Sequence, residues 1–393
     1  MKQLLTKYND KLVSQGLCDT GVPLICGLDD KLIWNRNSPL CGVLEEVIAD
    51  LTINSLLFAK SAEPYFSIIN YFIKDNIATI YPQDCETRTF LHDIPVTSEL
   101  AVPTIIEALK RRKSIVIKDQ GIVTFGIVSV EQAFIVYSSV CFAFFVKFFT
   151  DYLEDVRQNK VSRRQEEIFR GAVKIYEYFL GKVNFVPSFS GPFHDKEEVI
   201  KAMVEAAKFT VDSRMVDSFF GNISYRLGDT IYISQTASSL DELAGCIDPC
   251  PIDGSSCAGV TASSEYVAHR DILLDTDVKA ILHGHPKFSV IMSMVCDDRE
   301  CGARGDCHIK CPKKRFISDI AVVSGEVGTG FYGLCKTLPP AVKDKRGAIV
   351  YGHGLFTVGQ SDFKDAFRNL VDIERMCFKI YLDRVKNGGN YDT

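Results

Sequence analysis

The chain has 393 residues, of which 46% are hydrophobic and 11% aromatic, and its formal net charge is −5. This length allows two domains that each bury a core of their own, and the composition is that of a globular protein, not a disordered one. The acidic balance excludes a broad basic surface for nucleic acid, whereas small anionic ligands stay open because backbone N–H groups bind phosphate without an excess of Lys or Arg.

The first segment of the chain, residues 1–16, lacks the apolar core of a signal peptide. The most apolar run, SSVCFAFFVKFF at residues 138–149, is interrupted by Lys147 and is too short to span a bilayer. We therefore expect a cytoplasmic protein without membrane contacts. In that reducing compartment the fourteen cysteines, nine of which lie beyond residue 240, predict free thiols or metal ligands instead of disulfides.

An internal repeat organises the chain. IVIKDQGIVTFG at residues 115–126 aligns with AIVYGHGLFTVG at residues 348–359, and AEPYFSII at 62–69 aligns with GHPKFSVI at 284–291. The spacing between these two motifs is about eleven residues longer in the second copy. We assign the extra residues to CDDRECGARGDCHIKC at 296–311.

The repeat predicts two domains with helices between them. Residues 128–182 have the apolar periodicity of helices, and the Gly- and Pro-rich stretch at 181–193 marks the boundary. A further helix is expected at 195–213, where Asp195 begins an acidic first turn. We expect a first domain at 1–182 and a second at 190–393.

Three histidines of the second copy form a candidate metal site. On a strand, positions i and i+2 share a face, so the side chains of His283 and His285 point the same way, and His353 follows from a strand–turn. Three imidazoles that leave a coordination position open are typical of catalytic zinc. In the alignment these histidines correspond to Ser61, Glu63 and Gln120, so the first copy lacks all three. Joint loss indicates one metal site that the first copy has discarded.

The motifs GNISYRLGDTIYIS (221–234), SSE (263–265), HGHP (283–286) and GHGLFTVG (352–359), in this order, resemble the class II aldolase/adducin family. The resemblance covers about 195–385, and the first half resembles the same fold more faintly. It implies an α/β class, with two tandem three-layer α/β/α domains around mostly antiparallel central sheets, the first degenerate. It also implies that His283, His285 and His353 bind a catalytic zinc ion and that Glu265 is the catalytic acid/base.

The resemblance also implies a phosphate site, at positions Asn222, Thr236, Ser263 and Ser264. The family usually has Gly after the threonine, whereas this chain has Ala237, whose Cβ disfavours a positive φ. The assisting tyrosine of the family has no clear counterpart, with Tyr332 and Tyr381 as candidates. His269, one turn beyond Glu265, is either a further site residue or a structural histidine.

A cysteine cluster lies in the extra segment, and the family offers no guidance on it. Cys296, Cys301, Cys307 and Cys311 are spaced C-x4-C-x5-C-x3-C, which differs from the C-x2-C pairs of common zinc knuckles. A second, structural zinc ion, an iron–sulfur cluster and free or regulatory thiols all remain open. Cys246, Cys250 and Cys257 lie just before the Glu265 segment; they either complete a site with the first group or are loop residues with no shared role, and we favour the second interpretation.

These features predict a zinc-dependent lyase. The expected reaction is reversible aldol cleavage of a phosphorylated ketose, similar to L-fuculose 1-phosphate, to dihydroxyacetone phosphate and an aldehyde. An epimerase, dehydratase or decarboxylase on the same scaffold, a non-catalytic interaction protein like adducin, and a redox- or iron-responsive enzyme are the alternatives. We expect a homo-oligomer, either a tetramer or a dimer of two-domain chains that imitates one.

Overall fold

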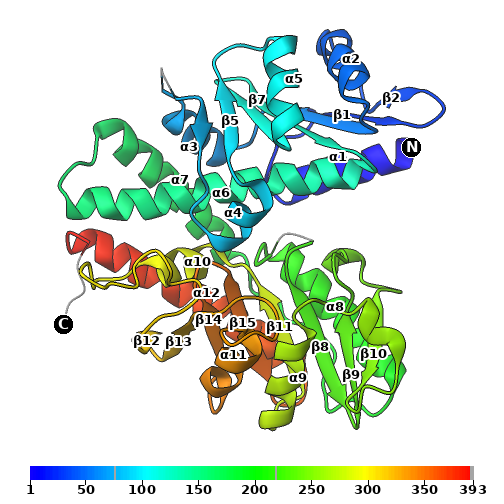
Figure 1. Ribbon diagram of the computed structural model, residues 1–393, viewed down its shortest axis with the longest axis vertical. Helices are drawn as coiled ribbons and strands as arrows, with labels where there is room; N and C mark the ends of the chain where they lie inside the picture. Colours follow the sequence, from blue (N-terminus) through cyan, green and yellow to red (C-terminus); the bar gives the residue numbers. More distant parts are fainter. Residues whose placement is uncertain (75–76, 217–218, 390–393) are drawn as a thin grey trace. The chain divides into compact units, whose positions relative to one another are not determined.

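The structure is a computed structural model that describes residues 1–74, 77–216 and 219–389. The chain divides into two compact units, Met1–Tyr178 and Phe179–Thr393, and each is built around one β-sheet (Figure 1). The protein is thus a mixed α/β chain with two sheets.

The first unit has a seven-stranded sheet of order β2-β1-β3-β7-β6-β5-β4. Its elements, in chain order, are α1 (Lys2–Ser14), β1 (Leu24–Leu28), β2 (Leu32–Trp34), α2 (Leu40–Leu51), β3 (Ser55–Ala59), α3 (Tyr65–Phe72), β4 (Thr79–Ile80), α4 (Cys85–Leu91), β5 (Ile94–Thr97), α5 (Val102–Arg111), β6 (Ser114–Ile117), β7 (Gly121–Gly126) and α6 (Val130–Arg157). Helix α7 (Arg163–Gly181) leads into the second unit. Helices α6 and α7 confirm the helical prediction for 128–182.

The second unit has an eight-stranded sheet of order β10-β9-β8-β11-β15-β14-β13-β12. Its elements are α8 (Lys196–Asp212), β8 (Asn222–Leu227), β9 (Thr230–Ser234), η1 (Leu240–Glu242), β10 (Ile247–Pro251), η2 (Cys257–Val260), α9 (Tyr266–Asp275), β11 (Ala280–Gly284), α10 (Lys287–Met294), β12 (Arg315–Ile317), β13 (Ile320–Val323), α11 (Leu334–Val342), β14 (Gly347–Val350), β15 (Gly354–Gly359) and α12 (Phe363–Lys386). The Asp195 carboxylate accepts hydrogen bonds from the N–H groups of Glu197 and Glu198, and so begins α8 as predicted.

The two sheets have the same topology. When β1 and β2 are matched to β8 and β9, and β3–β7 to β11–β15, the strand order is the same in both sheets. Strand β10 is an additional edge strand of the second sheet. In each sheet one pair is parallel, β5 with β6 and β13 with β14, and the other pairs are antiparallel. The long helix after the last strand, α6 or α12, packs back on the sheet.

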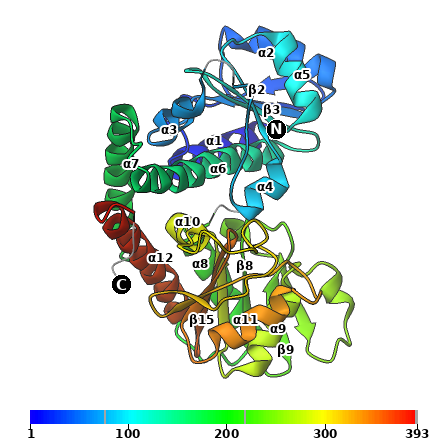
Figure 2. The same cartoon turned by 60° about the vertical axis from the view of Figure 1, so that its left-hand side comes forward.

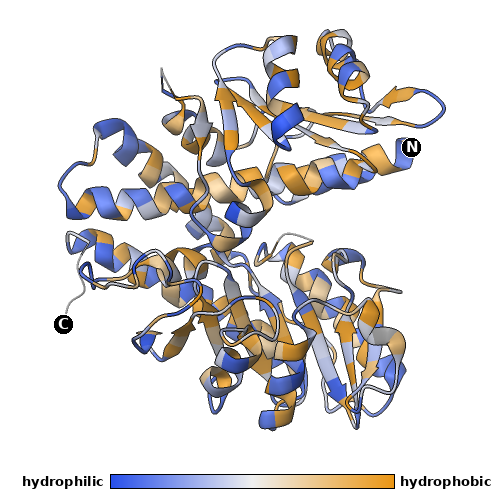
Figure 3. Ribbon diagram, viewed as in Figure 1, coloured by the Kyte–Doolittle hydropathy of each residue, from blue (hydrophilic) through white to orange (hydrophobic). Residues whose placement is uncertain are grey.

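Each unit has three layers. In the second unit α9 and α11 cover one face of the sheet and α8, α10 and α12 cover the other (Figures 1 and 2). In the first unit α2 and α5 occupy the equivalent face, with α1 and α6 on the opposite one. Figure 3 shows the hydrophobic residues concentrated in the strands of both sheets, where these layers meet.

Helix α6 contains the apolar run at 138–149 and is 28 residues long, so length and apolarity alone would let it cross a membrane. The expectation of a run too short to span therefore missed the extent of the helix. Its most apolar window is 83% buried inside the protein, with side chains such as Phe144 and Phe148 in the core of the first unit. This burial accounts for the composition of α6 as that of a core helix.

Strand pairing corrects one part of the sequence alignment. Gly126 pairs with Ser55 and Gly359 pairs with Ala280, so β3 and β11 match with Phe58 at the place of His283 and Lys60 at that of His285. The alignment on Ser61 and Glu63 was shifted by three residues. The alignment matched the similar helices α3 and α10. Because the connection from strand to helix is longer in the first unit, the preceding strands were then out of register. Gln120 keeps its match with His353, because each residue directly precedes the glycine that begins β7 or β15.

The cysteine segment lies in the loop between α10 and β12, residues 295–314, which has no helix or strand. The equivalent connection in the first unit, 73–78, is much shorter, but the first unit has α4 between β4 and β5, where the second has only a tight turn. The net difference of about eleven residues therefore combines insertions and a deletion, and the assignment to 296–311 alone was too simple.

Candidate metal centre

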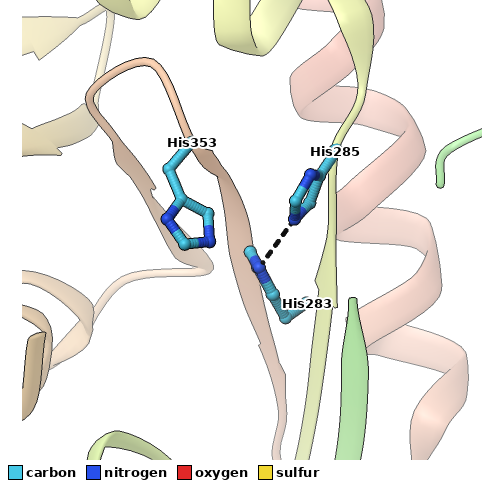
Figure 4. A group of neighbouring side chains, drawn as sticks. All are labelled: His283, His285 and His353. Atoms are coloured by element: carbon cyan, nitrogen blue, oxygen red, sulfur yellow. Dashed lines mark hydrogen bonds between the residues drawn. The ribbon is translucent and has the colours of Figure 1, made fainter. Parts of the chain in front are cut away.

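The three predicted histidine ligands meet in the second unit. One nitrogen from each of His283, His285 and His353 lies within 4.8 Å of the others, and all three side chains are buried (Figure 4). The Nε2 atoms of His283 and His285 are 3.0 Å apart. Among the described residues, this is the one group of His, Cys, Asp or Glu side chains that converges in this way.

Two neighbouring strands bring the histidines together. His283 is in β11 and pairs with Phe356 of β15, whose ring stacks on the imidazole at a centroid distance of 3.9 Å. β11 ends at Gly284, so His285 lies just beyond the strand, where its N–H group donates to the carbonyl of Met215. His353 is in the turn between β14 and β15.

Gly354 allows this turn to approach the histidine pair. A Cβ at Gly354 would lie 2.5 Å from the carbonyl oxygen of Gly284, 2.7 Å from Cε1 of His283 and 2.9 Å from Cδ2 of His285. Real Cβ atoms do not come so close, so only glycine fits at this position.

The surroundings of His283 favour a neutral imidazole with Nε2 available. Nδ1 lies 3.2 Å from the carbonyl oxygen of Leu355, an acceptor that requires the proton on Nδ1. Burial, together with neighbouring His353 and His269, holds the pKa of His283 well below its ordinary value. The lone pair of Nε2 therefore points toward the other two rings.

Glu265 lies beside the histidines at the N-terminus of α9. Its Oε1 is 3.3 Å from Nε2 of His353, and its Oε2 is 3.5 Å from Nε2 of His283. The side-chain amide of Asn222 donates to Oε2 at 2.5 Å and so orients the carboxylate. Within the described part of the chain, Oε1 of Glu265 and Oδ1 of Asn222 are buried without a hydrogen-bond partner. Buried polar atoms in such a state point to a bound group or water.

The four candidate phosphate residues come from three segments that lie side by side. Asn222 begins β8 and pairs with His283. Thr236 and Ser263 lie in the segments 234–236 and 261–263, whose backbones are hydrogen-bonded to each other. Ser263 is buried and its Oγ accepts from the N–H group of Glu265, whereas Ser264 and Thr236 are exposed. The result is a group of hydroxyl and N–H donors at the start of α9.

Ala237 adopts a positive φ, the backbone conformation that its Cβ was expected to disfavour. Its φ is +55°, in the left-handed region that favours glycine. The strain of an alanine in this conformation is about 1–2 kcal/mol.

His269 is a fully buried histidine. Its Nδ1 lies 2.7 Å from Oγ of Ser224, and burial lowers its pKa to about 4. Of the two candidate tyrosines, Tyr381 is fully buried against Phe288, and the ring of Tyr332 lies under the ammonium of Lys310.

A buried glutamate that the sequence analysis missed holds the segment after the histidine pair. The Glu374 carboxylate in α12 accepts from the N–H groups of Phe288 and Ser289 and from Oγ of Ser289, each at 2.7 Å. It thus caps α10, which begins two residues after His285. The sequence contains a signal for it, because Glu374 interrupts the apolar face of α12 formed by Leu370, Cys377 and Tyr381.

The four predicted cysteine ligands, Cys296, Cys301, Cys307 and Cys311, line one cavity of about 80 Å³. No disulfide joins them, and Cys307 is the buried member of the four. Cys250 lies within β10 and is buried, and Cys257 begins η2 and is exposed, so the interpretation of these two as loop residues was wrong.

Comparison with known proteins identifies the domain around this site. Residues 201–382 match the family described as Class II Aldolase and Adducin N-terminal domain. No curated protein matches the sequence. Among solved structures, L-fuculose-1-phosphate aldolase from Thermus thermophilus is 19% identical, with a TM-score of 0.40 over 50% of this chain and 100% of that one.

Two further solved structures have similar values. L-fuculose 1-phosphate aldolase from Glaciozyma antarctica is 16% identical, with a TM-score of 0.36 over 52% of this chain and 79% of that one. A sugar-phosphate aldolase from Thermotoga maritima is 18% identical, with a TM-score of 0.36 over 50% of this chain and 98% of that one. Residues 201–382, which carry all three histidines and Glu265, are a class II aldolase/adducin domain.

Proposed function

We propose that the second unit is a zinc-dependent aldolase that reversibly cleaves a phosphorylated ketose, similar to L-fuculose 1-phosphate, to dihydroxyacetone phosphate and an aldehyde. One observation carries the proposal. The Glu265 carboxylate lies within 3.5 Å of imidazole nitrogens of both His283 and His353, so an acid/base group adjoins the meeting point of the three histidines.

The residues present fit a zinc ion. His283, His285 and His353 would be its ligands, and three imidazoles with a buried carboxylate beside them match the donor set of catalytic zinc. The hydrogen bond from His283 to the Leu355 carbonyl supplies the outer support that such ligands need. A bound zinc ion would act as a Lewis acid toward the ketose oxygens.

The chain's own residues would move the proton and hold the substrate. Glu265 would deliver a proton to the ketose carbon that loses its partner when the carbon–carbon bond breaks, and remove it in the reverse direction, with Asn222 keeping the Glu265 carboxylate in place. Ser263, Ser264 and Thr236 would bind the phosphate together with the N–H groups at the start of α9. Burial of the histidines and Glu265 would exclude water and strengthen these interactions.

For the first unit we propose a degenerate second copy of the domain that serves assembly. The common strand order of the two sheets supports this proposal. At the three ligand positions the first unit has Phe58, Lys60 and Gln120, none of which can replace an imidazole as zinc ligand. Residues 1–182 and 190–393 remain the proposed domains, and the cytoplasm remains the proposed compartment.

The test combines metal content with product analysis. We expect the wild type to carry zinc at the histidines and the His283→Ala/His285→Ala variant to lose about one ion per chain. Glu265→Gln keeps an acceptor for Asn222 but cannot move a proton, so it should keep its zinc and lose about 10²- to 10⁴-fold in kcat. Glu107→Gln, an exposed residue of the first unit, is the control and should change neither value.

Ketose 1-phosphates of four to six carbons are the substrates to screen. Release of dihydroxyacetone phosphate supports the aldolase. An epimer, loss of water or loss of carbon dioxide would replace it with the epimerase, dehydratase or decarboxylase alternatives on the same scaffold. Metal retained in the double histidine variant would contradict the zinc site itself and favour a non-catalytic interaction protein.

A further inference from the structure

The loop 295–314 gathers four thiols around one cavity. Besides Cys296, Cys301, Cys307 and Cys311, the cavity of about 80 Å³ is lined by Met294, Asp298, Arg304, Lys313, Arg315 and Tyr351. All of these residues belong to the second unit. The cavity is separate from the convergence point of the histidines, because none of the three histidines lines it.

Polar contacts, and not regular secondary structure, hold this loop in place. It has no helix or strand, and polar and charged residues predominate in CDDRECGARGDCHIKCPKK. Its ties to the rest of the unit include Oγ of Ser324 to the Cys307 carbonyl at 2.5 Å and Arg315 to the Val295 carbonyl at 2.6 Å. The Arg384 guanidinium also pairs with the Asp297 carboxylate, and the N–H group of Gly325 donates to the His308 carbonyl. A polar loop without an apolar core gains order from metal–thiolate bonds, as small metal-dependent folds do.

The arrangement of the thiols distinguishes between two candidate metal centres, a single zinc ion and an iron–sulfur cluster. A single zinc ion with bonds of about 2.3 Å would draw its four sulfur atoms to within about 3.8 Å of one another. Among the described residues, the three histidines are the one group with three ligand atoms within 4.8 Å of one another, so no three of the cysteine sulfurs around the cavity come that close together. An inorganic cluster carries its iron atoms at separate corners, and four cysteines complete its coordination. We propose that Cys296, Cys301, Cys307 and Cys311 hold a [4Fe–4S] cluster.

The charges around the cavity suit such a cluster. Four thiolates make the bound cluster anionic, and Arg304, Lys313 and Arg315 line the same cavity. Asp298 is the acidic residue of the lining, and its carboxylate pairs with Lys313. The cationic side chains therefore outnumber the acidic one and offset the cluster's charge.

Its role follows from its coordination and its neighbours. With a cysteine at each iron the cluster has no open position for a substrate, so it stabilises structure instead of binding the ketose. Tyr351 lines the cavity and lies two residues before His353, and the Arg315 guanidinium is 5.7 Å from the centre of its ring. A filled cavity would hold the turn that carries His353.

The experiment uses the full chain, produced with added iron and purified without oxygen. Wild-type protein should be brown, with about four iron atoms and four acid-labile sulfides per chain. Its visible absorbance should bleach on reduction with dithionite. Cys301→Ser/Cys311→Ser should lose at least nine-tenths of the iron, the sulfide and the absorbance. Cys257→Ser, an exposed cysteine outside the cavity, is the matched control and should lose none.

Each other outcome overturns the cluster. Colourless wild type with a second zinc ion that disappears in the double cysteine variant would establish a mononuclear zinc site. Colourless wild type that carries no metal beyond the histidine site would establish free thiols. Because these readouts come from the wild type, they stand even if the cysteine variant does not fold. His283→Ala/His285→Ala should keep its iron and sulfide, so a failed aldolase proposal leaves this test intact.

Discussion

Ala237 combines an unfavourable backbone with a position in the candidate phosphate loop. At φ +55° an alanine is strained by about 1–2 kcal/mol, and glycine is not, although glycine loses part of this gain to its more flexible unfolded state. We expect Ala237→Gly to raise the free energy of unfolding by about 0.5–1 kcal/mol. Because the loop already takes this course, KM for the phosphorylated substrate should stay the same.

Chemical denaturation, compared with the KM values, checks this prediction. Ala207→Gly, within α8, is the control and should lower the free energy of unfolding by about 1 kcal/mol or more. A destabilised Ala237→Gly protein would mean that the loop does not adopt a positive φ in solution.

At the scale of elements, Glu374 illustrates how the two units cap equivalent helices differently. In the second unit a buried carboxylate from α12 caps α10, whereas in the first unit the exposed Glu63 caps α3 through Ser67. Cys141 occupies the α6 position that corresponds to Glu374. The long-range cap thus belongs to the unit with the histidines, which indicates a positioning role for Glu374.

Glu374→Gln should therefore weaken zinc binding. It places an amide N–H group against backbone N–H donors and removes a charge-assisted bond, at a cost of about 2 kcal/mol in unfolding free energy. Since α10 begins just after His285, we expect about tenfold weaker zinc binding, measured by competition with a chelator. Glu63→Gln is the matched control, with unchanged zinc affinity. Equal zinc affinity in both variants would reduce Glu374 to a stabilising residue.

The turns before β7 and β15 allow the effect of a glycine on backbone packing to be distinguished from its effect on metal binding. A Cβ at Gly121 would lie 2.4 Å from the Ala59 carbonyl oxygen, so both turns require glycine, but only Gly354 also faces imidazoles. We expect Gly354→Ala and Gly121→Ala both to destabilise the protein, and Gly354→Ala alone to lose zinc. Metal analysis of the folded fraction of each variant distinguishes the two. Zinc retained by Gly354→Ala would show that the turn carrying His353 can move away.

At the scale of the whole molecule, the repeated topology predicts an assembly. If the degenerate unit replaces one member of a ring of like domains, two chains supply four domains, and a homodimer is the expected active species. Sedimentation velocity should then give twice the mass of one chain at concentrations where the enzyme is active. A fully active monomer would contradict this prediction.

The sequence by itself predicted the three histidines that the structure brings together, and it indicated a repeat that the common strand order of the two sheets supports. The H-x-H pair, the cysteine spacing and the start of α8 at Asp195 are local patterns that can be recognised in the sequence, and the Asp195 cap is confirmed because helix capping depends on neighbouring residues alone. The order of the motifs further indicated the family of the second unit.

Only the tertiary structure decided what depends on contacts between distant segments. The match of β3 to β11, with Phe58 at the place of His283, comes from hydrogen bonds to β7 and β15 and not from the similar helices that follow. The cap from Glu374 spans 85 residues or more, and the common cavity of the four cysteines depends on how a loop without regular structure packs. Loop lengths and packing set these features, because neither is encoded in the periodicity of a single element.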